Sequence, residues 1–263
     1  LVGNSCKLSK YLMEHDKTYL VEMKFGYHTE TLDIEGDILE EDIPFRENNI
    51  VDNDFFDRII AAMKKEMGTK KQIPPIYSAK KLNGNKLYEI ARKDKEKATE
   101  MAKEKSKEIT IYNMYDISLK ELWDNDPKDI VLSFKVECSS GTYIRSLVRD
   151  IAENMQTMAV MTDLKRITVG EYSFDYEESD EDSQKKVEEI ILKEYTEEEV
   201  LKHNFKNSIN LDKNRKKAFL VGLSTRIDTN KYSDGIYLVS IEDEIIGLRR
   251  NKRWGNKKKV CSK

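Results

Sequence analysis

Residues 130–151 place two hydrophobic periods next to each other in the sequence. Every second residue from Ile130 to Cys138 is apolar, which is the pattern of a half-buried β-strand. Ser139-Ser-Gly141 then breaks the strand, and Thr142 is a candidate N-cap for a helix with one apolar face. That face consists of Ile144, Leu147, Val148 and Ile151. Such a strand and helix, in a chain without regular alternation of strands and helices, favour a mixed α+β layer fold.

Two further strands and a second helix are expected before this segment. Alternate residues from Tyr19 to Phe25 are apolar, so a strand is predicted over Lys17–Gly26, and another over Ile109–Leu119. Residues 52 and 53 offer caps to a helix whose apolar face is Phe55, Ile59 and Met63.

The region between that helix and the Ile109 strand is expected to be irregular. Pro74 and Pro75 forbid regular helix and predict a stiff, extended segment. A short helix is predicted over Lys86–Arg92. Residues 93–108 are mostly Lys and Glu, so this stretch has little apolar surface to bury and is expected on the surface.

The composition changes near Asp175. Residues 175–199 hold 12 acidic residues and three lysines, whereas residues 249–263 hold eight basic residues and no acidic one. Charge segregated in this way is compatible with a local phosphate-binding surface despite a net charge of −3, because the local field governs capture. A solvated connector and a frayed basic tail are the alternative interpretation. Apolar runs at 218–222, 235–241 and 244–248 are typical of a small β-rich module.

Cysteine and histidine are too scattered to form a metal centre. The three cysteines and three histidines show no CxxC or HxxxH spacing, so neither a zinc site nor a disulfide framework is predicted. We expect a reducing, cytoplasmic compartment, because there is also no signal sequence and no apolar run long enough to span a membrane. Any chemistry would depend on Asp, Arg, Lys and Tyr.

Four motifs occur in a fixed order along the first two thirds of the chain. They are Asn4-Ser-Cys-Lys-Leu-Ser-Lys-Tyr-Leu12, Lys17-Thr-Tyr19, Ile73–Gly84 together with Leu87–Arg92, and Cys138–Asp150 with its Gly141-Thr-Tyr-Ile-Arg145 core. In this order and spacing they resemble the TruB family of tRNA pseudouridine synthases. Leu164-Lys-Arg166 resembles that family's next segment. The resemblance is close over residues 1–172 and looser over the last 50 or so.

The resemblance implies a fold and a division into domains. The fold is α+β, with a mixed, largely antiparallel sheet flanked by helices, followed by a small β-rich module similar to PUA domains. We therefore expect a catalytic domain over residues 1–174, an acidic connector and helix over 175–210, and a PUA-like RNA-binding module over 211–263.

The resemblance also implies an activity. The family isomerises uridine 55 in the T-loop of tRNA to pseudouridine: the base is flipped out, the N-glycosidic bond breaks, and a carbon–carbon bond forms. The implied partner is the T-arm of tRNA. No cofactor, metal or membrane is implied, and the protein is expected to be a monomer.

Two residues match catalytic positions of the family. Arg145 matches the arginine that pairs with the catalytic aspartate and holds that carboxylate ionised and oriented. Tyr19 matches the tyrosine that stacks on the flipped base and is a candidate for proton transfer. Position alone would favour a surface arginine of a helix for Arg145, and the Gly141-Thr-Tyr-Ile-Arg145 motif reverses that preference. Without its motif, Tyr19 could be a core aromatic residue of a strand.

Four further residues match substrate-binding positions. Tyr143 and Leu164 match residues that contact the uridine, one with a polar or stacking edge and the other as a hydrophobic wall. Tyr77 and Lys81 lie in the Pro-Pro-x-Tyr-Ser-Ala-x-Lys segment, which we interpret as structural support near the site and as a contact to the RNA backbone.

The nucleophilic aspartate is not in the chain. In the family it lies in a Gly-Thr-Leu-Asp-Pro segment shortly before the position of Asn4, and the abrupt start at Leu1 leads us to expect a truncated chain. Thr31-Leu32-Asp33 spells part of that segment but follows the Lys17-Thr-Tyr19 motif instead of preceding it. It resembles a second stretch of the family, here Thr29–Gly36. We therefore predict that Asp33 is a turn carboxylate whose removal leaves most activity intact.

Two alternatives to an active enzyme remain. The chain could be a catalytically silent protein of the same fold that binds or folds tRNA. It could also be an α+β domain with an unrelated partner, although that interpretation does not explain four ordered motifs. The residues before Leu1 would separate the enzyme from the silent protein.

Overall fold

The computed structural model describes residues 6, 8–42, 53–82, 85–120, 130–173, 196–221, 233, 235–242 and 244–251. They belong to two compact units, Leu1–Leu192 and Lys193–Lys263, and each unit is taken by itself. Most of the acidic stretch 175–199 and of the basic tail 249–263 lies outside the described residues. The domain boundaries at residues 174 and 210 therefore stay a prediction.

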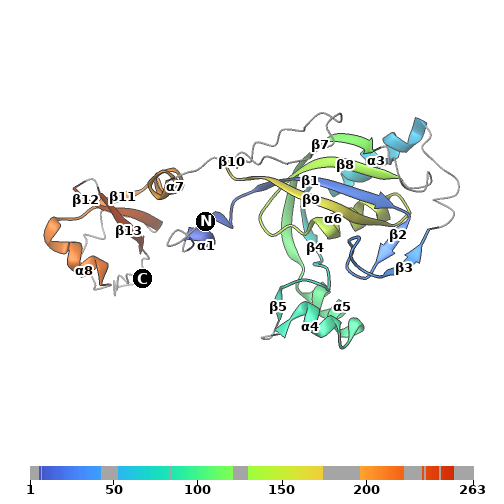
Figure 1. Ribbon diagram of the computed structural model, residues 1–263, viewed down its shortest axis with the longest axis horizontal. Helices are drawn as coiled ribbons and strands as arrows, with labels where there is room; N and C mark the ends of the chain where they lie inside the picture. The colour runs from blue at the N-terminus through green and yellow to red at the C-terminus, as the bar shows by residue number, and fades with distance from the viewer. Residues whose placement is uncertain are drawn as a thin grey trace, which may run out of the picture. The chain divides into compact units, whose positions relative to one another are not determined.

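A six-stranded sheet forms the centre of the first unit (Figure 1). Its strand order is β10-β9-β1-β8-β7-β4, and each neighbouring pair is antiparallel. In that order the strands span Tyr172–Ser173, Ala159–Val169, Lys17–Phe25, Val131–Cys138, Lys107–Lys120 and Gly68–Gln72. The three strands predicted from alternation are confirmed as β1, β7 and β8. The predicted α+β fold with a largely antiparallel sheet is confirmed as well.

One hydrophobic core lies between this sheet and two amphipathic helices. On β1, Val21, Met23 and Phe25 are each at most 1% exposed. The helices α3 (Asn53–Glu66) and α6 (Ile144–Asn154) cover the same core with their apolar faces. Their core residues include Phe55, Ile59, Met63, Leu147, Val148 and Ile151. Both predicted helices are thus confirmed, because the positions expected to be apolar are the buried ones.

The first turn of α6 differs from the prediction. Its N-cap is Tyr143, whose side chain makes no capping hydrogen bond, so the prediction of Thr142 as the cap is wrong. The Oγ1 atom of Thr142 donates instead to the carbonyl of Ser139 at 2.9 Å, inside the turn that follows β8. Gly141 has a φ of +82° in this turn, which favours glycine. A hydroxyl that closes this turn is no longer available to the helix.

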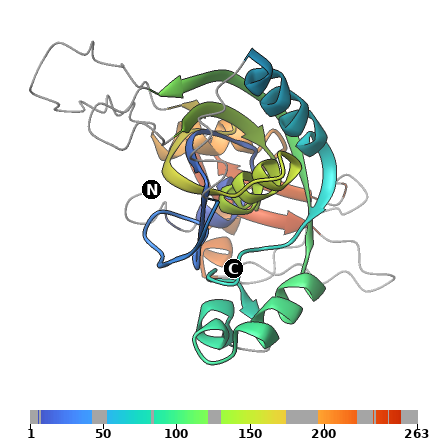
Figure 2. The same ribbon diagram turned by 90° about the vertical axis from the view of Figure 1, so that its right-hand side faces the viewer.

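Two short helices, α4 (Leu87–Ala91) and α5 (Lys95–Glu104), form a pair that we call the helical arm, set to one side of the sheet (Figure 2). The two-residue strands β5 (Lys81–Leu82) and β6 (Asn85–Lys86) precede it. The buried side of the arm consists of Leu87, Ala91, Ala98 and Ala102, against which Ile73, Ile76 and Tyr77 pack. The short helix α4 was predicted. Helix α5 was not, because its apolar side is built only from alanines and a methionine.

The remaining elements of the first unit lie before and after β1 in the sequence. The helix α1 spans Ser9–Leu12 and precedes β1. The strands β2 (Tyr27–Thr29) and β3 (Ile38–Glu41) form a hairpin after β1. The loop of this hairpin carries the residues that the sequence placed in the Thr29–Gly36 stretch.

The second unit is built around a three-stranded sheet. Strand β12 (Gly235–Ile241) pairs in parallel with β11 (Ser208–Asn210) and antiparallel with β13 (Glu244–Asn251). The helices are α7 (Glu197–Asn204), a 3₁₀ turn at Lys213–Arg215, and α8 (Lys216–Leu220). Two of the three predicted apolar runs are strands, whereas the run beginning at Ala218 lies in α8 up to Leu220. The similarity of this unit to PUA domains stays a prediction.

Candidate active site

Arg145, on the first turn of α6, holds together two segments that are distant in the sequence. Its Nη1 atom donates to the carbonyl of Thr31 at 2.9 Å and to Oδ2 of Asp33 at 3.0 Å. Its Nη2 atom donates to the carbonyl of Tyr77 at 3.0 Å. The side chain is 24% exposed. Three acceptors fix the plane of the guanidinium, so Arg145 is not an ordinary surface arginine.

The loop of the β2–β3 hairpin presents Asp33 to Arg145. Oδ1 of Asp33 accepts from Thr31 Oγ1 at 2.5 Å and from the backbone N–H of Glu35 at 3.2 Å. Oδ2 is thereby left to Arg145. A Cβ atom at Gly36 would lie 2.3 Å from Thr31 Oγ1, so only glycine fits beneath this turn. Asp33 thus lies in a loop, as predicted, but the sequence did not predict its ion pair with Arg145. That its removal leaves most activity intact stays a prediction.

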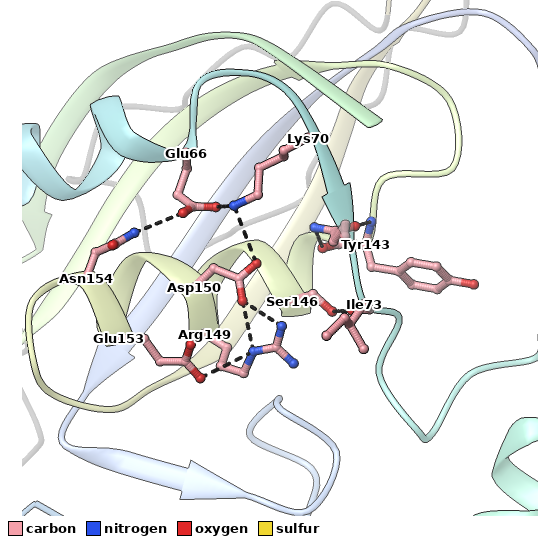
Figure 3. A network of polar contacts seen from close by, with 10 residues as sticks. Glu66, Lys70, Ile73, Tyr143, Ser146, Arg149, Asp150, Glu153 and Asn154 are labelled. Carbon is pink, nitrogen blue, oxygen red and sulfur yellow. Dashed lines mark hydrogen bonds and ion pairs between the residues drawn. The ribbon is translucent and has the colours of Figure 1, made fainter. Parts of the chain in front are cut away.

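Gln72, the last residue of β4, fastens the start of α6. Its Oε1 atom accepts from the N–H of Tyr143 at 2.8 Å, and its Nε2 atom donates to the carbonyl of the same residue at 3.1 Å. The next turn is held by Ser146, whose Oγ donates to the carbonyl of Ile73 at 2.9 Å. Gln72 is 3% exposed and Ser146 is fully buried. Figure 3 shows the bond between Ser146 and Ile73, which joins the segment after β4 to the helix. The bonds at Tyr143 and Ser146 flank Arg145 on both sides in the sequence.

The following turns of α6 are tied to α3 and β4 by a polar network (Figure 3). Glu66, buried at the end of α3, pairs with Lys70 of β4 and accepts from Asn154 Nδ2 at 2.9 Å. Lys70 Nζ also lies 3.9 Å from Oδ2 of Asp150, while Oδ1 of Asp150 accepts from Arg149 Nη2 at 2.6 Å. Burial raises the pKa of Asp150, and the Arg149 charge acts against this shift. The helix is thus anchored along its length.

Tyr19 and Leu164 form a second group of predicted residues, on the neighbouring strands β1 and β9. Tyr19 pairs in register with Arg166, and Val21 pairs with Leu164, so the residue pairs that contain Tyr19 and Leu164 lie two apart along the two strands. Burial raises the pKa of the Tyr19 hydroxyl, whereas the charge and hydrogen bond of Arg166 lower it. Leu164 is 38% exposed, which leaves an apolar surface for contact.

Tyr77 contacts the site with both its backbone and its side chain. Its carbonyl accepts from Arg145, and its hydroxyl donates to Oε1 of Glu30 at 2.5 Å. The same Oε1 lies 2.5 Å from Nζ of Lys95, at the start of the helical arm. Burial and the Glu30 carboxylate raise the pKa of Tyr77 to about 12. The structure thus brings Tyr77, Tyr143 and Arg145 together, whereas the side chain of Lys81 lies outside the described residues.

The site residues that the sequence missed are Gln72, Glu30 and Asp33. Gln72 directly precedes the motif Ile73–Gly84, which we call the proline segment, and its place beside this motif was the available signal. Glu30 and Asp33 lie in the Thr29–Gly36 stretch that resembles the family, and this was their signal, but acidic residues in a hairpin loop are ordinarily solvated, so no contact was predicted for them.

Two kinds of feature are absent from the residues that the structure describes. No three His, Cys, Asp or Glu side chains gather closely enough there to hold a metal ion. Nor does any helix in this part of the chain combine the length and apolar character needed to cross a membrane.

Comparison with known proteins gives a consistent family. The model described as "TruB family pseudouridylate synthase (N terminal domain)" matches residues 1–144. The tRNA pseudouridine synthase B of Limosilactobacillus reuteri is 38% identical over 194 residues, which cover 74% of this chain and 60% of that protein. The enzyme of the same name from Clostridium perfringens is 37% identical over 202 residues, covering 77% of this chain and 58% of the relative. The chain thus spans about three fifths of the length of these curated relatives.

Among solved structures, the chain is similar to one described as "Structure of H/ACA RNP bound to a substrate RNA containing 2'-deoxyuridine". The TM-score is 0.47 and the sequence identity 14%, with 97% of this chain and 66% of the other covered.

Proposed function

Because the chain belongs to the TruB family of pseudouridylate synthases, we propose that the protein isomerises uridine 55 in the T-loop of tRNA to pseudouridine. The reaction exchanges the bond from C1′ to N1 of the base for a bond from C1′ to C5, and the proton on C5 is replaced by one on N1. No atom is gained or lost overall, so no cofactor is required.

The observation that supports this proposal is that the Arg145 guanidinium is held by three hydrogen bonds and has further N–H groups to donate. A guanidinium has five N–H groups, and the described contacts use three of them. Nε and one N–H of Nη2 are left for a further acceptor. A carboxylate fits two neighbouring N–H groups of this kind in a bidentate pair. We propose that this edge receives the nucleophilic aspartate.

That aspartate comes from outside residues 1–263 in this proposal. The Gly-Thr-Leu-Asp-Pro segment of the family is not among them, and both oxygens of Asp33 already have partners. Arg145 would hold the incoming carboxylate ionised and aimed at the reacting sugar or base.

Tyr19, Tyr143 and Leu164 would bind the flipped uridine. Tyr19 stacks on the base and takes part in the proton transfer, Tyr143 offers a stacking edge, and Leu164 forms an apolar wall. Extrusion of a base costs a few kcal/mol of lost stacking, which these contacts can offset. Tyr77 and Lys81 support the site and contact the RNA backbone.

The same proposal covers the partner and the setting. The T-arm of tRNA is the partner, recognised by loop shape more than by extended sequence, as is usual for structured RNA. The protein acts in the cytoplasm as a monomer, without metal or cofactor, and the second unit serves as a PUA-like RNA-binding module.

The test is release of tritium from C5-labelled uridine in T-arm RNA. Residues 1–263 alone should release none, and the same chain preceded by a Gly-Thr-Leu-Asp-Pro segment should release tritium from position 55. Release by residues 1–263 alone would mean that a carboxylate within the chain, Asp33 first, is the nucleophile. Tight binding of the T-arm without release by either chain would favour the catalytically silent RNA-binding protein.

A further inference from the structure

We propose that Glu30 is a positioning residue that connects the helical arm to Arg145 through Tyr77. This inference rests on the proposed function for its catalytic meaning, because Arg145 is the group being positioned. It assigns a role to an acidic side chain outside the motifs that bind the uridine.

Three segments of the chain meet at one oxygen of Glu30. The carboxylate lies at the start of the β2–β3 loop and is 23% exposed. Its Oε1 atom accepts the hydroxyl of Tyr77 at 2.5 Å and lies 2.5 Å from Nζ of Lys95. Tyr77 belongs to the proline segment and Lys95 to the first turn of α5. Glu30 therefore cross-links the loop, the proline segment and the arm.

The same loop and the same proline segment supply the acceptors of Arg145. Thr31, whose carbonyl accepts from Nη1, follows Glu30 directly in the loop. Tyr77, whose carbonyl accepts from Nη2, is the residue whose hydroxyl reaches Glu30. The contacts form a closed ring that runs from Arg145 to Thr31, Glu30, Tyr77 and back. Without the Glu30 contact, only Arg145 itself would set the distance between the two carbonyls in this ring.

Lys95 occupies a position that its own helix does not favour. It is the first residue of α5, where the positive end of the helix dipole repels a cation. A nearby carboxylate offsets this repulsion, and Glu30 is the partner in place. The ring of Tyr77 also packs against the arm. A displacement of the arm would therefore shift Lys95, Glu30 and Tyr77 together, and with them the Tyr77 carbonyl that accepts from Arg145.

The first experiment uses residues 1–263 and needs no activity. The Nη protons of Arg145, identified by their loss in Arg145→Lys, should give slowly exchanging NMR signals because three acceptors hold the guanidinium. These signals should persist in Glu30→Gln, whose amide oxygen still accepts from Tyr77. They should be lost in Glu30→Ala and in Tyr77→Phe. Glu35→Ala is the matched control, since Glu35 lies in the same loop and its side chain is exposed.

The second experiment uses the chain extended by the aspartate segment, at saturating tRNA. Glu30→Ala should lower the single-turnover rate by roughly 10- to 100-fold, the range of a lost hydrogen bond to a charged group, and leave the Kd for tRNA within about threefold. Glu30→Gln should recover most of the rate. The double variant Glu30→Ala/Tyr77→Phe should be no slower than either single variant, because both break the same ring.

The outcomes separate this inference from the proposed function. If the unmutated extended chain forms no pseudouridine, the proposed function fails, and the NMR signals still decide whether Glu30 positions Arg145. Unchanged signals in Glu30→Ala overturn the positioning role. A rate loss matched by an equal loss of tRNA affinity would instead make Glu30 part of the RNA-binding surface, which also overturns the proposal.

Discussion

The guanidinium of Arg145 lies 3.0 Å from Oδ2 of Asp33, although 112 residues separate them in the sequence. The other oxygen of Asp33 is held by Thr31 and by the backbone of Glu35. Contacts within its own loop thus orient the Asp33 carboxylate towards Arg145. The backbone carbonyls of Thr31 and Tyr77 likewise orient the guanidinium for a further ligand. Such preorganisation avoids an entropic cost at the moment of reaction.

Replacement of Arg145 should affect chemistry more than RNA affinity. Arg145→Lys keeps the charge but loses the planar fork, so the single-turnover rate of the extended chain at saturating tRNA should fall by about 10²–10⁴-fold. The Kd for tRNA, measured beside it, should change little. Weak binding with a normal rate once bound would make Arg145 a phosphate contact instead.

Asp33 should matter more than a turn carboxylate does. Asp33→Ala leaves Arg145 with two neutral carbonyls, so the single-turnover rate of the extended chain should fall by roughly 10- to 100-fold. Asp33→Asn keeps the shape of the loop and should be less impaired. Asp37→Ala, at an exposed position of the same loop, serves as the control. A rate equal to the unmutated chain in Asp33→Ala would restore the simpler role.

Gln72→Glu should make stability depend on pH. An ionised carboxylate at this buried position faces the Tyr143 carbonyl and cannot donate to it, whereas a protonated one can. The pKa of the new Glu would therefore be higher in the folded than in the unfolded chain. Stability should be greatest below the unfolded pKa of about 4.3 and decline as pH rises through the folded value.

Urea unfolding of Gln72→Glu and the unmutated chain, compared between about pH 5 and about pH 8, measures this effect. The difference in unfolding free energy should widen by about 1–3 kcal/mol towards the higher pH. Gln72→Ala, which lacks both bonds at every pH, should show a constant difference. A constant difference for Gln72→Glu would mean that its carboxylate turns to solvent.

Two adjacent phenylalanines of α3 should differ sharply in their contribution to stability. Phe55 is fully buried in the core, while Phe56 is 40% exposed. Phe55→Ala should cost about 3–5 kcal/mol of unfolding free energy, and Phe56→Ala about 1 kcal/mol or less. The helix propensity change is the same for both, so urea unfolding isolates the effect of burial. Equal losses would show that this face of α3 does not cover the core as described.

The sequence predicted those parts of the fold that follow from local periodicity. Strands β1 and β8 and the apolar face of α6 were predicted because each pattern is complete within a few turns or residue pairs. The start of α6 was less predictable, since Thr142 is a good N-cap in isolation but its hydroxyl bonds within the turn before the helix. Helix α5 was missed because Ala98 and Ala102 bury little surface each and need Leu87 beside them.

The site was predictable only where a motif identified it. Arg145, Tyr143 and Tyr77 came from motifs, and the structure brings them together, although their roles stay proposals. The contacts of Arg145 with Thr31 and Asp33 join residues more than a hundred positions apart. The patterns that predicted the strands are all local. Long-range pairings of this kind depend on strand order and register, which one sequence does not reveal.

The strand order also has a consequence during protein synthesis. Strand β1 lies between β8 and β9, both of which are made long after it. While the ribosome extends the chain, β1 therefore has two open edges and an alternating apolar side, the features that invite pairing with other chains. The charges of its lysines at positions 17 and 24, near the two ends of the strand, oppose such association. The nascent chain should depend on chaperone protection until residue 169 has emerged.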